Sequence, residues 1–170
     1  GQYGYLKSEL FMGGSRGDLG YSFFGSHMQQ DGWRDHSAVQ NIFSQAKLNF
    51  RTSADSDLMV VFREFYSPLS KDPGALTSAE VHANPRQASA RNVQFNAGEE
   101  IRQEEIGMRF RNRFSGGKEF TATTYLLHRD FQNRQAFFDG GQVQFDRWVG
   151  GLMLQFVNDH ILFHRPNRFL

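Results

Sequence analysis

The sequence contains no cysteine, which excludes a disulfide framework and a thiolate metal site. It also lacks any apolar run near the roughly 20 residues that a membrane-spanning helix needs. Its 19 basic and 18 acidic side chains leave a net charge of +1, so there is no bulk attraction to nucleic acid or to anionic lipid. No signal peptide is visible and the chain starts at Gly1, so we expect a piece of a longer protein.

Aromatic residues are abundant instead, at 15% of the chain, with 18 phenylalanines and 17 glycines. Strands joined by glycine-containing turns use residues in this way. Alternation is plainest at residues 106–120, where apolar and basic side chains take turns. The apolar set is Ile106, Met108, Phe110 and Phe114, and Gly107, Arg109, Arg111 and Arg113 lie between them. Since side chains alternate between the faces of a strand, this pattern predicts a strand with one apolar and one basic face.

Similar alternation predicts about seven long strands in an antiparallel meander. Their ranges are 3–12, 19–28, 40–51, 58–66, 106–120, 120–129 and 142–156. The connections alternate in length. Short ones are expected at 13–18, 52–57 and 115–119, and long ones at 29–38, 67–102 and 130–141. Strands near ten residues with short turns at one end and long loops at the other are typical of outer-membrane barrels.

Within the longest loop, Thr77 and Glu80 have the spacing of a capping box and predict a brief helix. Asn84 and Pro85 then predict where that helix stops.

Two arrangements fit a sheet with one apolar face. In a soluble sandwich that face is buried by a second layer, and in a membrane barrel it meets lipid. The polar exceptions on the apolar face, His27, Glu64 and His128, fall at the long-loop ends of their strands, where lipid headgroups would tolerate them. An arginine facing lipid at mid-depth costs about 2–4 kcal/mol, so the arginines of a barrel must face its lumen.

Enzyme motifs are weak, and we predict no catalytic, cofactor-binding or metal-binding residues. Residues 13–17 (GGSRG) match the nucleophile-elbow pattern G-x-S-x-G, which requires a strand followed by a helix. Another strand-like run follows here, so a hairpin turn is the better interpretation. His160 and His164 are four residues apart, which would suit a metal only on a helix with a third ligand, and Pro166 argues against such a helix.

Basic residues gather on the expected lumen face, namely Lys47, Arg63, Arg109, Arg111, Arg113 and Arg129. They fit either ion pairing with acidic groups of whatever fills the barrel or a path for anionic cargo. Aromatic and basic residues near the outer mouth, with Phe137 and Phe138 among them, are further candidates for touching cargo. The ligand-binding candidates are Trp33, Arg34, Arg63, Tyr66, Arg129, Phe131 and Arg134.

Two motifs resemble those of TonB-dependent outer-membrane receptors, especially the receptors for ferric siderophores. DGWRDHS at 31–37 is similar to a D-G-[YFW]-R-D-H-S segment that closes an early strand of that barrel. PGALTSAEVHANPRQA at 73–88 is similar to a loop in which P-G-x-L-T leads to N-P-R-Q-A or D-P-R-Q-A. With the strand spacing, the likeness reaches to about Phe156.

The resemblance implies that residues 1–170 are part of a 22-stranded transmembrane β-barrel domain whose plug domain and remaining strands are absent. Residues 1–12 would be about the second strand and 142–156 about the eighth, with the long loops outside the cell. It also implies location in the bacterial outer membrane, contact with its lipid, and TonB-driven uptake of a ferric siderophore or similar iron chelate. TonB would act through the missing plug.

Two other functions stay open, a passive porin segment and a soluble all-β ligand-binding module. A plug domain upstream of Gly1 would favour the receptor over the porin.

Overall fold

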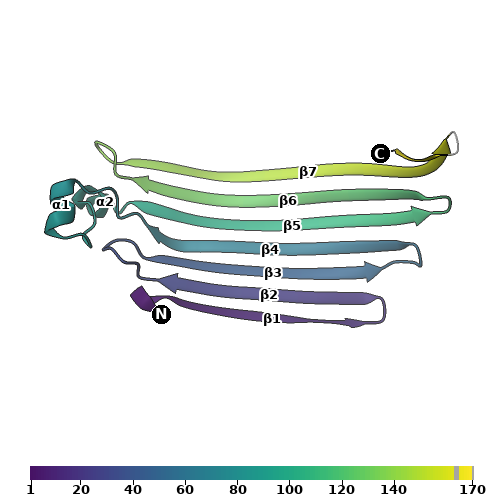
Figure 1. Ribbon diagram of the computed structural model, residues 1–170, viewed down its shortest axis with the longest axis horizontal. Coiled ribbons are helices and arrows are strands. Elements are labelled where there is room, and N and C mark those ends of the chain that lie inside the picture. The colour runs from purple at the N-terminus through teal and green to yellow at the C-terminus, as the bar shows by residue number, and fades with distance from the viewer. Residues whose placement is uncertain (163–164, 170) are drawn as a thin grey trace.

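The computed structural model describes residues 1–162 and 165–169 and shows a single antiparallel sheet (Figure 1). In this part of the chain the strands pair in chain order, each with its sequence neighbours. They are β1 (Leu6–Arg16), β2 (Leu19–Gln30), β3 (Val39–Arg51), β4 (Ser56–Lys71), β5 (Gly98–Phe114), β6 (Lys118–Gln135), β7 (Gly141–Leu162) and the short β8 (Arg165–Phe169). The predicted all-β meander with seven long strands is therefore confirmed.

Connections of two kinds lie at opposite ends of the sheet, as predicted (Figure 1). Residues 17–18, 52–55 and 115–117 form the short turns, while 31–38, 72–97 and 136–140 form the longer loops. The longest loop carries two short helices, α1 (Ser78–Ala83) and α2 (Ala90–Gln94). Neither helix is long and apolar enough to cross a membrane, and the described residues contain no other candidate. A short 3₁₀ helix, Gln2–Gly4, precedes β1.

The strand register fixes the two faces. Val60 lies opposite Leu48 on one side and Met108 on the other, so these three side chains share the apolar face. Arg63 lies opposite Gln45 and Glu105 on the polar face. The same register places Lys47, Arg109, Arg111, Arg113 and Arg129 on that polar face. It also places His27, Glu64 and His128 on the apolar face toward the long loops.

No second layer covers either face within the described residues. The buried apolar residues there are only Val61, Ala97 and Val157. Leu48 and Phe110, in the middle of the apolar face, keep 38% and 37% of their surface exposed. A sandwich would bury these side chains between two sheets. The two-layered arrangement is therefore wrong for this part of the chain.

Strand boundaries differ most from prediction at the long-loop end. The expected loop 67–102 is shorter, because β4 continues to Lys71 and β5 already begins at Gly98. The extra residues read SPLSK and GEEIR, in which polar side chains occupy both faces. Backbone pairing continues there although apolar and polar side chains no longer alternate. The alternation therefore ends before the strand ends.

The GGSRG segment was predicted to be a turn, but Gly13–Arg16 belongs to β1 and only 17–18 turn the chain. Tyr21 explains how the glycines persist in a strand. It lies opposite Gly14, and a Cβ added to Gly14 would be 2.8 Å from the Tyr21 Oη, so the ring covers the bare backbone. Of the two terminal histidines, His160 lies in β7 rather than on a helix, and His164 lies outside the described residues.

The capping box is present as predicted, and Asn84 ends α1. The Thr77 hydroxyl and its backbone N–H both donate to the Glu80 carboxylate, at 2.8 and 2.7 Å. The Glu80 N–H donates back to the Thr77 Oγ1 at 3.3 Å. The box therefore satisfies free N–H groups at the start of a helix that has only 6 residues.

The two Thr77 donors hold the pKa of the Glu80 carboxyl below its ordinary value. Because the pKa is lower in the folded state, the box stabilises α1 fully above the unfolded-state pKa. That contribution is lost as pH falls through the folded-state pKa. We expect amide exchange in 78–83, corrected for its intrinsic pH dependence, to accelerate in this acidic range. Glu80→Gln should abolish that pH dependence, and an unchanged profile in the variant would contradict the assignment.

Candidate functional site

The seven ligand-binding candidates do not lie on one surface. Trp33 and Arg34 lie in the loop 31–38. On the polar face are Arg63, Arg129 and Phe131. Tyr66 and Arg134 lie on the opposite face, which carries Leu48 and Val60. The seven residues therefore cannot all contact one cargo inside a barrel.

The basic side chains of the polar face are mostly paired across strands. The Arg63 Nη1 lies 3.0 Å from Glu105, and its Nε donates to Gln45 at 3.1 Å. Arg111 donates to the Asp57 carboxylate from Nε and Nη2, at 2.9 and 2.7 Å. Arg129 donates to the Gln103 amide oxygen. Exposed pairs of this kind add little stability, so they mainly orient the guanidinium groups.

Arg109 differs from these neighbours. Its Nε is buried and has no hydrogen-bond acceptor among the described residues. It lines a hollow on the polar face with Arg63 and Arg111 on either side, and with Glu105 and Thr123. An unsatisfied guanidinium N–H is costly. The hollow therefore suits an acceptor oxygen supplied from outside this sheet.

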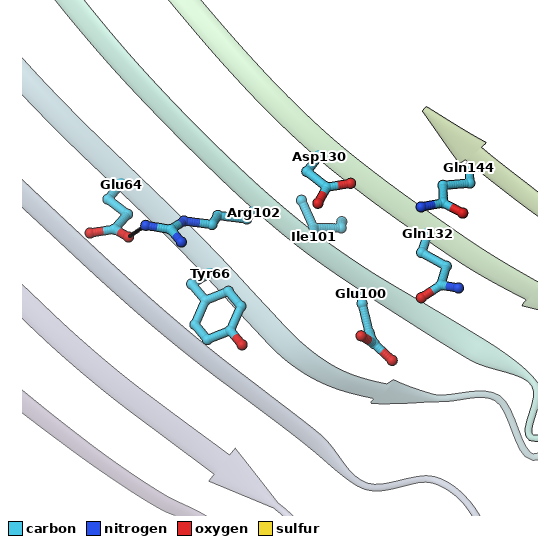
Figure 2. A pocket seen from close by; sticks show the side chains of 8 residues that line it. All are labelled: Glu64, Tyr66, Glu100, Ile101, Arg102, Asp130, Gln132 and Gln144. Atoms are coloured by element: carbon cyan, nitrogen blue, oxygen red, sulfur yellow. Dashed lines mark ion pairs between the residues drawn. The ribbon is translucent and has the colours of Figure 1, made fainter. Parts of the chain in front are cut away.

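A second groove lies on the other face, where the apolar side chains end and the long loops begin (Figure 2). Its lining residues are Glu64, Tyr66, Glu100, Ile101, Arg102, Asp130, Gln132 and Gln144. The Arg102 Nη2 lies 3.5 Å from Glu64 and 2.8 Å from Glu104. Because all but Ile101 share the face of Val60, this groove opens away from the basic polar face. Tyr66 belongs to it, and Arg134 is ion-paired nearby with Glu100.

The loop candidates have a different role from the strand candidates. The Arg34 guanidinium donates to the backbone carbonyls of Gly74 at 2.6 Å and Gln87 at 3.0 Å. It also donates to Pro73 at 3.1 Å. Arg86 donates from Nε to the Trp33 carbonyl at 3.1 Å. Arg34 is thus engaged with protein backbone, while the Trp33 side chain remains 44% exposed.

The segments 31–37 and 73–88, which look unrelated in the sequence, therefore form one contact region. Arg86 and Gln87 were not among the candidates, and neither was Asn92, which is only 8% exposed and donates to the Asp72 carbonyl. Both segments were visible as motifs, but nothing local in either one indicates the other as its partner.

Within the described residues, no cluster of three or more histidine, aspartate or glutamate side chains could hold a metal ion.

A scan against known protein families matches none of them. Among solved structures, the chain is similar to the crystal structure of the ferric citrate transporter FecA in the unliganded form, with a TM-score of 0.82 and 13% sequence identity. The match covers 95% of this chain and 24% of that chain, so this chain spans about a quarter of the length of FecA. At this identity the likeness shows the fold: one sheet matching a segment of a β-barrel like that of FecA.

Gly74, whose carbonyl accepts from Arg34, has φ +67°, and a Cβ there would clash with the Asn92 side chain. Gly17 has a similar φ of +58° but nothing within 4 Å of the added Cβ. We expect Gly17→Ala to cost only the left-handed backbone term, about 1–2 kcal/mol. Gly74→Ala should cost more and should raise hydrogen exchange across 72–97. If Gly17→Ala and Gly74→Ala destabilise the segments around them equally, the contact between residue 74 and Asn92 is unimportant.

Proposed function

We propose that the chain is a wall segment of a bacterial outer-membrane receptor that takes up a ferric siderophore or another iron chelate with energy delivered by TonB. One observation carries the proposal. Over the residues that the structure describes, a single sheet presents an apolar face that no protein layer covers and a charged face directly behind it. The structural likeness to FecA supports the barrel, and the two loop motifs support the receptor type.

Lipid is the partner that the apolar face fits. Val60, Met108 and Leu152 lie at about the middle of this face on their strands, and Leu152 is 68% exposed. In a bilayer core, every backbone N–H and C=O must be satisfied within the protein, which for strands requires a closed barrel. We therefore propose that further strands pair with the outer edges of β1 and β7 and so close the sheet.

The polar face then lines a lumen, and the sequence resemblance implies a plug domain there. Arg109, with its buried and unpaired Nε, would receive an acceptor from that plug. Arg63 and Arg129 lie nearer the long loops than Arg109 and keep exposed guanidinium groups. We assign these two to the path of an anionic iron chelate, and the plug would contact TonB on the periplasmic side.

A membrane-facing residue can be distinguished from a lumen-facing one on the same strand. We expect Leu152→Arg in the complete receptor to destabilise the barrel by about 2–4 kcal/mol, since its charge would face hydrocarbon. Gln155→Arg, on the polar face three residues away, should cost much less. Urea unfolding in lipid vesicles measures both. If Leu152→Arg leaves the free energy of unfolding unchanged, this face does not contact the bilayer.

Uptake tests the cargo assignment. Changing Arg63 and Arg129 together to Gln removes two positive charges from the proposed path but retains hydrogen-bonding side chains. We expect uptake of ferric citrate or another anionic iron chelate by cells carrying the complete receptor to fall several-fold. Arg51→Gln is the control, because Arg51 is exposed beside a short turn.

Unchanged uptake would exclude the two arginines from the cargo path. Uptake that persists without TonB would instead indicate a passive pore.

A further inference from the structure

The second long loop, 72–97, is joined by direct contacts to the first, 31–38, and to the third, 136–140. Four hydrogen bonds run from the Arg34 side chain in the first loop to three carbonyls, of Pro73, Gly74 and Gln87, in the second. Pro73 and Gln87 flank α1, so one side chain holds both ends of this part of the loop. These bonds span 39 to 53 residues of sequence.

Further bonds join the same two loops. The Asp35 N–H donates to the Arg86 carbonyl at 2.7 Å. The His36 Nε2 lies 2.9 Å from the carbonyl of Ala97, which is only 1% exposed. Ala97 and Asn92 are among the few buried residues of the described chain, so the loop 72–97 contains buried positions of its own.

The third loop, 136–140, contacts α2 and the residues that follow it. The Arg91 guanidinium lies 5.9 Å from the centre of the Phe138 ring. Gly140 has φ +80°, and a Cβ there would be 2.7 Å from the Phe95 ring, so the two segments are in close contact. Arg134, at the end of β6, donates to the Asn96 carbonyl at 3.3 Å.

We propose that Arg34 is a latch that joins the first two loops, and that the contacts of the third loop with Arg91 and Phe95 complete a single preformed cap at the end of the sheet. Its charge is only partly exposed, and its hydrogen bonds all go to backbone carbonyls. Removing the side chain would leave the Gly74 and Gln87 carbonyls without this donor, while Pro73 would keep the Ser89 N–H. Lysine cannot replace arginine here because one ammonium lacks the fork of a guanidinium.

The latch has a consequence for binding. A ligand that meets ordered loops does not have to order them, which is the advantage of preorganisation. Phe137 and Phe138, which are 63% and 88% exposed, form the apolar tip that the cap presents to such a ligand. This consequence for binding rests on the proposed function. The joining of the loops by Arg34 does not depend on which cargo the barrel transports.

Hydrogen exchange on the complete protein in lipid vesicles tests the latch without any cargo. We expect Arg34→Ala and Arg34→Lys each to raise amide exchange in 72–97 at least about tenfold, the ratio that corresponds to one charged hydrogen bond of about 1.4 kcal/mol. Exchange in β4 and β5 should not change. Arg51→Ala, at the opposite end of the sheet, is the matched control. If amide exchange in 72–97 of the Arg34→Ala variant is as slow as in the wild type, the proposal is overturned.

A crosslink distinguishes a lost latch from a loosened barrel. Residues 1–170 contain no cysteine that could compete, so Asp35→Cys and Arg86→Cys can be introduced together, at backbones already in hydrogen-bond contact. In the Arg34→Ala background the oxidised pair should restore slow exchange in the loop, and reduction should reverse it. The same pair with Arg34 intact controls for the lost Arg86 side chain. If the oxidised crosslink forms without restoring protection, Arg34 does not act by joining the loops.

Discussion

The whole structure depends on one constraint: a lone β-sheet has two faces and cannot cover either with itself. Here the middle of one face is apolar from β1 to β7, and the other face carries Arg63, Arg109 and Arg111. Within the described residues neither face has a protein layer above it. In water such a sheet would expose a large apolar surface, which is the usual sign of an interaction site. Hydrocarbon on one side and a filled lumen on the other satisfy both faces at once. The proposed positions of the membrane, the lumen and the cargo path all follow from this difference between the two faces.

The central part of the sheet could be predicted because the environment of each strand changes at every residue there. Ile106, Met108 and Phe110 lie on one face, and Arg109 and Arg111 lie on the other. The residue types therefore alternate with a period of two. Beyond this band both sides of the wall are polar. Apolar and polar side chains no longer need to alternate there. The long-loop ends of β4 and β5 were therefore missed by the prediction, although their backbone pairing continues.

Candidate residues were placed less well than strands, and one signal was overlooked. Arg63 and Tyr66 are three residues apart on the same strand, and an odd separation places two side chains on opposite faces unless a bulge intervenes. Counting that parity would have separated Tyr66 from Arg63. The partnership of Arg34 with Gln87 had no such signal. Long-range contact between a guanidinium and backbone carbonyls depends on the folded path of the loop, while the Thr77 capping box depends only on local spacing and was predicted correctly.

The four strands that line the groove around Tyr66 and Arg102 have 16 to 22 residues, whereas about 9–11 tilted residues cross a bilayer core. In the proposed barrel, the long-loop ends of these strands would therefore stand clear of the hydrocarbon and carry Glu64, Arg102 and Asp130 on the outer surface. A partner that approached the proposed barrel from the side would meet paired strands there, in a surface whose shape is set by the sheet and does not depend on the loops.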